Sequence, residues 1–314
     1  MPTSYHLHWD AEALWQRLEP LLPGLSVEVV ARVGSTNTEL LERMRRIPAV
    51  HGRVREGLDP ASAAAVHAAG TPRGPGRREA DTQPCLLVAE HQSRGRGRQG
   101  KAWQSSPGAS LTFSLALALA PADWSGLSLA VGLAVAETFD PLLPGERPRL
   151  GIKWPNDLLL IDPAAPQGGR KLGGILIETV QVGDRRMAVI GIGLNLLPQP
   201  AEGPEPALSW GYACLQELVY GLTAPAALAR LAEPLVRMLL AFEREGFAPL
   251  RERFAARDLL AGRAVTTTLP GLPAGVADGV DDTGTLWLRV DGQRRPVASG
   301  EVSLRAAGPL TGAC

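Results

Sequence analysis

Residues 171–196 read KLGGILIETVQVGDRRMAVIGIGLNL, and this stretch decides the fold. Two apolar runs rich in residues that favour strands flank the polar turn GDRR at 183–186. Strands joined by so tight a turn run in opposite directions, because parallel strands need a long crossover between them. The stretch therefore predicts antiparallel pairing.

Further strands and helices are expected on both sides of this pair. Strands are expected at 26–33, 85–92 and 110–119, and 150–161 is read as two short strands around the turn Trp154–Asp157. Helices are expected within 10–22, 34–47, 126–143 and 226–257. In the first helix Asp10 is the expected N-cap, with Leu14, Trp15, Leu18 and Leu22 on one face. In the second, Thr36 and Glu39 have capping-box spacing, and Leu40, Leu41, Met44 and Ile47 follow at helical spacing.

The chain divides into two expected domains. Residues 1–258 predict an α+β domain with a mostly antiparallel sheet and flanking helices. Residues 259–314 contain short β segments separated by Gly and Asp, which predict a small β-barrel. Residues 52–83, rich in Ala, Gly, Pro and Arg, are expected to form a mobile insertion in a surface loop.

Composition excludes several classes of protein. The 314 residues carry 32 basic and 32 acidic side chains, which argues against a whole surface built for nucleic acid. Three well-separated cysteines support neither a disulfide framework nor a zinc site, so a reducing cytoplasm is expected. The start shows no signal peptide, and Pro121, Asp123 and Gly126 interrupt the apolar segment 111–139, so no membrane association is expected.

A local concentration of positive charge occurs at residues 91–104, HQSRGRGRQGKAWQ. Glycines would let the backbone close around a ligand, arginines bind carboxylate or phosphate in a fork, and Trp103 could cover a heteroaromatic group. These residues fit a clamp for a carboxylate next to a phosphate. The same sequence is also compatible with a segment that binds RNA, or with a loop that is only solvated.

Three other motifs have both a chemical and a structural interpretation. Lys171 precedes two glycines, but the P-loop order is not present, and an exposed lysine is the plain alternative. The KWPND turn at 153–157 could hold a metal–phosphate group through Mg²⁺, or be only a tight turn. The STN motif at 35–37 is read as a helix N-terminus, where free N–H groups can also bind a polar ligand.

Six motifs in one order resemble a biotin–protein ligase. They are STN, QxxGRGRxGxxW, KWPND, RKLGGILIE, GIGxN and a terminal GEVSLR, spread from residue 35 to residue 305. The resemblance implies a class II synthetase-like catalytic domain, shared with lipoate ligases, and a C-terminal SH3-like barrel. It implies that biotin and MgATP form biotinyl-5′-adenylate, from which biotin passes to a lysine of a biotin carboxyl carrier protein of acetyl-CoA carboxylase or a similar carboxylase.

The resemblance also implies roles for individual residues. Lys171 and Arg98 are the expected catalytic residues, beside the biotin carboxylate and the α-phosphate. Biotin binding is expected from Ser35, Thr36, Asn37, Gln92, Gly95, Arg96, Gly97, Arg98, Lys171 and Gly174. ATP or adenylate binding is expected from Arg96, Arg98, Trp103, Lys153, Asn156, Asp157, Lys171, Asn195 and Arg305, with Asp157 facing Mg²⁺ through ATP. Lys101 and Glu301 are further candidates, and the 91–104 loop is expected to act as a lid.

Three departures and several alternatives accompany the resemblance. Lys101 stands where the family usually has Arg, and Arg94 is an extra charge that the resemblance does not explain. The third departure is the insertion at 52–83, which lies between the STN motif and the expected lid. Because STN begins at residue 35, no N-terminal helix-turn-helix is expected, and hence no DNA binding. A homodimer is an open alternative. A lipoate or octanoate ligase, an RNA-binding protein and an inactive biotin sensor are the rival functions.

Overall fold

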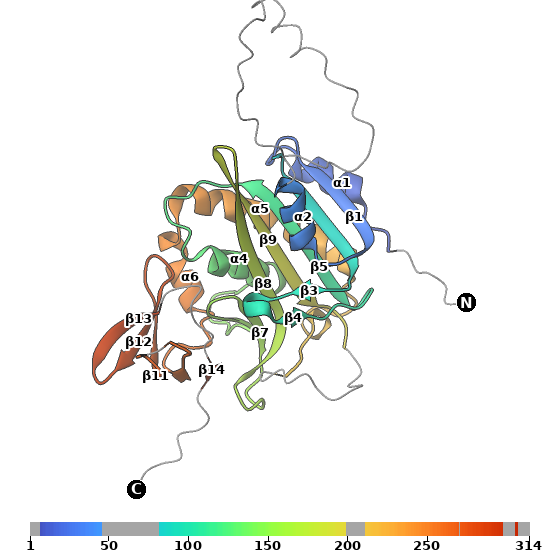
Figure 1. Ribbon diagram of the computed structural model, residues 1–314. Coiled ribbons are helices and arrows are strands. Elements are labelled where there is room, and N and C mark those ends of the chain that lie inside the picture. Colours follow the sequence, from blue (N-terminus) through green and yellow to red (C-terminus); the bar gives the residue numbers. More distant parts are fainter. Residues whose placement is uncertain (1–6, 46–81, 199–210, 270, 298–304, 307–314) are drawn as a thin grey trace, which may run out of the picture.

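The computed structural model describes residues 7–45, 82–198, 211–269, 271–297 and 305–306. A seven-stranded sheet with the order β1-β2-β5-β9-β8-β7-β6 forms its main layer (Figure 1). Its strands are β1 Ser26–Val33, β2 Cys85–Gln92, β5 Ser110–Ala118, β6 Leu150–Lys153, β7 Asp157–Ile161, β8 Gly169–Val182 and β9 Arg185–Asn195. The expected strands and the mostly antiparallel pairing are confirmed. The one parallel pair described, β1 with β2, is joined by a connection that contains a helix, as parallel strands require.

Helices cover both faces of this sheet (Figure 1). The helices α1 Ala11–Leu18, α4 Leu127–Phe139 and α5 Ala224–Glu245 build the larger apolar core on one face, and α6 Arg251–Ala255 follows them. The helix α2 Thr36–Arg45 packs Leu40, Leu41 and Met44 on the other face, against Leu87 and Val189. Alternation along a strand explains the division, since Leu86 and Val88 belong to the first core and Leu87 to the second.

The first two helices differ in detail from the prediction. Asp10 is the N-cap residue of α1 as expected, but it has φ 46° and its side chain makes no capping bond. Trp15, expected on the same face as Leu14 and Leu18, is 42% exposed and its Nε1 donates to Leu25 O. The helix α2 begins at Thr36, so Ser35 takes the N-cap place and its Oγ accepts from Thr38 N at 3.5 Å. Glu39 pairs with Arg43 instead of completing a capping box. Ile47 lies outside the described residues.

The C-terminal strands form a second, five-stranded antiparallel sheet in the order β13-β12-β11-β10-β14. They are β10 Ala264–Thr266, β11 Ala274–Val280, β12 Leu286–Val290, β13 Gln293–Val297 and β14 Arg305–Ala306. The expected small β domain is confirmed as an antiparallel sheet. Among the described residues, the strand pairings form an open sheet and not the closed barrel that was expected.

The edge strand β6 and the residue after it contact the segment that leads to the second sheet and one turn of that sheet. Ile152 N donates to Arg257 O, and Leu259 N donates to Ile152 O. Trp154 Nε1 donates to Gly284 O, at the turn before β12, over 3.0 Å. The domain division at 258 stays a prediction, and the expected insertion at 52–83 falls outside the described residues except for its last two. No helix in the described part of the chain is long and apolar enough to cross a membrane.

Candidate active site

The floor of the candidate site is the α2 face of the central strands. Gly174 of β8 is paired with Gly193 of β9, and Gly191 is paired with Ser114 of β5. A side chain at Gly193 would place its Cβ 2.5 Å from the Trp103 ring, and one at Gly191 would collide with Asn37. The glycines of the GIGxN motif therefore let α2 and Trp103 lie directly on the sheet.

A buried polar cluster lies where α2 begins. Thr36 donates to Gln92 Oε1 from its backbone N over 2.7 Å and from its hydroxyl over 3.2 Å. The Asn37 amide donates to Leu176 O and Glu178 Oε2, 3.1 Å each. Ser114 Oγ lies 2.6 Å from both Thr36 Oγ1 and Asn37 Oδ1. Three of the residues expected to bind biotin, Thr36, Asn37 and Gln92, thus meet in space and are held in fixed orientations.

Sequence reasoning missed two members of this cluster. Ser114 is fully buried inside the apolar strand β5, and Glu178 lies on β8 near the rim of the site. A hydroxyl in the middle of an apolar strand was the available signal for Ser114, because a buried polar group needs a partner. Glu178 ends the RKLGGILIE motif, but nothing in its spacing shows that it contacts α2.

A cluster of charges lies at the turn between β6 and β7. Asp157 Oδ1 accepts from Lys171 Nζ at 2.7 Å, and Asp157 Oδ2 accepts from Lys153 Nζ at 3.3 Å. Burial on its own raises the pKa of Asp157, but the ammonium groups of Lys171 and Lys153 outweigh it and the pKa is lowered. Burial lowers the pKa of Lys153, and that of Arg98, with Asp157 offsetting part of each shift. The cluster has more cations than anions, so it favours an anionic ligand.

A β-bulge turns Lys171 toward Asp157. Leu158 is paired with Gly173 and Leu159 with Lys171, which leaves Leu172 as the extra residue. Residues 171 and 174 would point to opposite faces of a regular strand. Asp157 pairs with Gly174, so the extra residue brings Lys171 and Gly174 to the face of Asp157.

The cationic loop forms a short hairpin of two strands, β3 and β4 (Figure 1). Its strands are β3 Gly95–Arg96 and β4 Ala102–Trp103, joined by a 3₁₀ turn at Arg98–Gly100 that contains the catalytic candidate Arg98. Arg96 NH2 lies 3.1 Å from Glu178 Oε1, and Arg96 NH1 donates to Thr38 Oγ1 over 3.3 Å. Gly97 N donates to Lys101 O over 2.7 Å. The loop thus crosses from the charge cluster to the polar cluster.

Trp103 is the aromatic wall of the site. Its ring lies on Gly193, and its buried Nε1 makes no hydrogen bond in the described structure. An unsatisfied buried donor costs free energy unless a ligand accepts from it. The position suits a heteroaromatic or heterocyclic ligand that stacks on the indole and accepts a hydrogen bond.

Asn156 and Asn195 fix backbone around the site. Asn156 Nδ2 donates to Ile175 O over 2.8 Å, and Asn195 Nδ2 donates to Lys171 O and Ala213 O. The Asn195 amide therefore binds backbone carbonyl groups on both sides of the end of β9. For Arg305 only the backbone is described, paired with Thr266, and Glu301 lies outside the described residues.

The donor set gives Mg²⁺ little to bind directly. Both Asp157 oxygens accept from ammonium groups, and no group of three metal-binding side chains occurs among the described residues. Magnesium usually takes one or two carboxylates together with substrate phosphates and waters. The residues present thus fit a cation that arrives with a nucleotide better than a resident metal.

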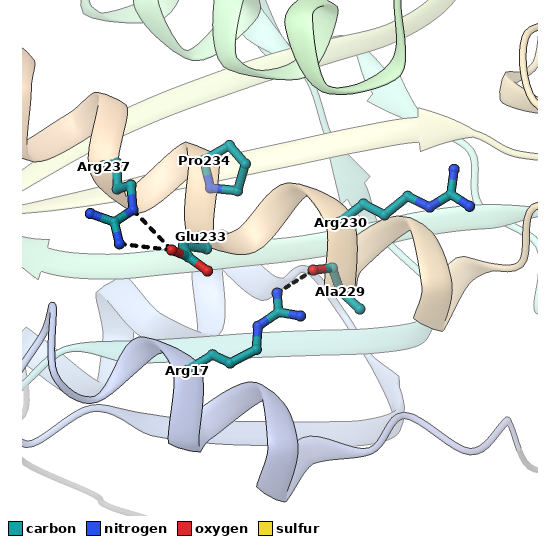
Figure 2. Close-up of a pocket in the computed structure, with 6 residues that line it drawn as sticks. All are labelled: Arg17, Ala229, Arg230, Glu233, Pro234 and Arg237. Atoms are coloured by element: carbon teal, nitrogen blue, oxygen red, sulfur yellow. Dashed lines mark hydrogen bonds and ion pairs between the residues drawn. The ribbon is translucent and has the colours of Figure 1, made fainter.

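A separate hollow lies on the other side of the sheet, between α1 and α5 (Figure 2). It is open and is lined by Arg17, Ala229, Arg230, Glu233, Pro234 and Arg237. Arg17 donates to Ala229 O, five residues before Pro234, and Arg237 pairs with Glu233. None of the predicted site residues lines this hollow.

Comparison with known proteins identifies relatives of both parts of the chain. Residues 78–195 match the biotin/lipoate A/B protein ligase family, and residues 261–305 match the biotin protein ligase C-terminal domain. The biotin–[acetyl-CoA-carboxylase] ligase of Mycobacterium tuberculosis is 34% identical over 284 residues, 88% of each chain. The bifunctional ligase/repressor BirA of Escherichia coli is 38% identical over 224 residues, 70% of this chain but only 66% of its own length.

Solved structures show the same fold. The biotin protein ligase of Aquifex aeolicus, in complex with biotin and ATP, matches with a TM-score of 0.60 at 21% identity. The match covers 90% of this chain and 99% of the other.

Proposed function

The chain belongs to the biotin protein ligase family, and from that premise we propose that it activates biotin with ATP and transfers it to a lysine of a carrier protein. The observation that carries the proposal is the cluster of Lys171, Lys153 and Asp157 beside the glycine floor, with Arg98 in the loop above it. The carrier is the biotin carboxyl carrier protein of acetyl-CoA carboxylase or of a similar carboxylase.

The first step joins two anions. A biotin carboxylate oxygen attacks the α-phosphorus of ATP, the bond to the β-phosphate oxygen breaks, and biotinyl-5′-adenylate and pyrophosphate result. Lys171 and Arg98 offset the repulsion between carboxylate and phosphate and stabilise the charge that develops. Asp157 takes one of the three N–H groups of Lys171 and orients the ammonium, which leaves the others for the ligand. Magnesium enters as part of MgATP, where it neutralises phosphate charge.

The second step transfers the biotinyl group. A neutral carrier lysine attacks the carbonyl carbon, the bond to the phosphate oxygen breaks, AMP leaves, and the amine loses a proton. Between the steps the hairpin from Gly95 to Trp103 acts as a lid that keeps water from the anhydride. The ureido head of biotin is bound by Ser35, Thr36, Asn37 and Gln92. The nucleotide is bound by Trp103, Asn195 and Arg305.

Some expectations stay predictions within this proposal. They are a cytoplasmic location, the lack of DNA binding and of repressor activity, and the oligomeric state, for which a homodimer is one alternative. Magnesium dependence is also a prediction, and the rate should fall on chelation and return when Mg²⁺ is added.

Intact mass of a biotin carrier domain tests the proposal directly. The domain is incubated with the chain, biotin and MgATP, beside reactions that lack ATP or contain lipoate instead of biotin. One biotinyl group added only with ATP and biotin supports the proposal. A lipoyl adduct would favour a lipoate ligase, and biotin binding without pyrophosphate release or adduct would favour an inactive sensor.

A further inference from the structure

We propose that Arg170 is a positioning residue that holds Lys171 in place for adenylate formation, through the segment Gly211–Glu217. The proposal rests on the function proposed above. Arg170 precedes the catalytic lysine in sequence, but its side chain contacts Asp162, Tyr212 and Glu217 instead of the charge cluster around Asp157.

The Arg170 guanidinium joins three parts of the chain. Nε donates to Asp162 Oδ2 over 2.7 Å, at the loop after β7. NH1 and NH2 donate to Glu217 Oε1 and Oε2 over 3.1 Å and 2.6 Å, and NH1 also donates to Tyr212 O over 2.8 Å. A planar fork makes these contacts together, which an ammonium group cannot do.

The segment Gly211–Ala213, which contains the Tyr212 carbonyl bound by Arg170, is hydrogen-bonded to the backbone of Lys171. Lys171 N donates to Gly211 O over 3.0 Å, and Lys171 O accepts from Ala213 N over 2.9 Å. The pairing of β8 with β9 begins only at Gly173, two residues further along. Gly211–Ala213 therefore takes the place of β9 beside Lys171, through the isolated bridge of Lys171 with Tyr212.

Glu217, which accepts from Arg170, is itself held in place by other hydrogen bonds. Its Oε1 accepts from Cys214 N over 3.0 Å, and its backbone O accepts from Arg149 NH2 over 2.7 Å. Arg170 thus connects the Glu217 carboxylate, which is held in place, to the segment that is hydrogen-bonded to the backbone of Lys171. Lys171 also sits next to the bulge at Leu172, where regular pairing is interrupted and backbone position depends most on such outside contacts.

The test compares Arg170→Gln with the wild-type chain in biotin-dependent pyrophosphate release. The turnover number for adenylate formation should fall about 10- to 100-fold, because a shift of about 1 Å in a catalytic group has that effect. The KM for biotin should change less than about threefold, since the ureido-binding residues on α2 and β2 do not contact Arg170. Arg170→Lys should recover only a small part of the rate, because it restores the charge but not the fork.

Two further variants separate positioning from general stability. Glu217→Gln keeps an oxygen for Cys214 N but weakens the fork, so its turnover should lie between wild type and Arg170→Gln. Arg237→Gln is the matched control, because it also removes an arginine ion pair but on the exposed face of α5. Its turnover should equal that of the wild type.

The outcomes can be told apart. A lower melting temperature in Arg170→Gln and Glu217→Gln, with turnover and KM unchanged, would overturn the inference and leave the ligase proposal standing. Full rescue by Arg170→Lys would also overturn it. Absence of pyrophosphate release in the wild-type reaction would overturn the function proposal, and the inference with it.

Discussion

Replacing Asp157 by Asn removes the carboxylate that lies between two ammonium groups. Lys153 is 6% exposed and Lys171 has a quarter of its side chain exposed, so solvent screens the first charge poorly and the second in part. Removing one partner of a buried ion pair costs about 3–5 kcal/mol, and we expect the lower end, about 3 kcal/mol, because of the exposure of Lys171.

The loss of stability in Asp157→Asn should depend on pH, and the pKa shifts give the direction of that dependence. The pKa of Lys153 is lowered by burial, and loss of Asp157 lowers it further. A lysine whose folded pKa is lowered destabilises the fold while it is protonated, so the variant should regain stability as pH rises from that pKa to about 10.4. The pKa of Asp157 is lowered in the wild type, so its contribution is lost as pH falls through the folded pKa. The two stability curves should therefore be furthest apart near neutral pH.

Urea unfolding followed by circular dichroism measures the difference at a series of pH values. Glu233→Gln is the matched control, because Glu233 pairs with the exposed Arg237 and should cost less than about 1 kcal/mol at every pH. A difference for Asp157→Asn below about 1 kcal/mol at neutral pH, or one that does not change with pH, would refute the reasoning.

The other predictions concern the reaction. Lys171→Ala should abolish or greatly slow pyrophosphate release while circular dichroism stays unchanged, and normal turnover would contradict its catalytic role. Arg98→Ala should let the adenylate escape, seen as free biotinyl-5′-adenylate in chromatography, whereas tight retention would mean that the lid works through other residues. Gly193→Ala should push Trp103 off the sheet and weaken ATP binding about tenfold with a change in tryptophan fluorescence, since the new Cβ would lie 2.5 Å from the ring.

Local sequence was sufficient for the elements and for naming the candidate residues of the site. The strands at 26–33, 85–92 and 150–161 were located by apolar runs and turn residues, which act over a few positions. Local patterns were weaker at helix ends and on partly covered faces. Trp15 has the spacing of a buried residue, yet it is partly exposed and its indole N–H donates to the Leu25 carbonyl.

The sequence by itself determined which residue types are available and in what order: a cationic glycine loop, a lysine before two glycines, and an Asn-Asp turn. Only the tertiary structure decided which of them meet. The bulge at Leu172 turns Lys171 to the face of Asp157, and the packing of α2 and of the β3–β4 hairpin on the sheet brings Asn37 to Ser114 and Arg96 to Glu178. The physical reason is that alternation and propensity act along the chain, whereas contacts across a sheet depend on register, and one extra residue in a strand reverses the face that a side chain occupies.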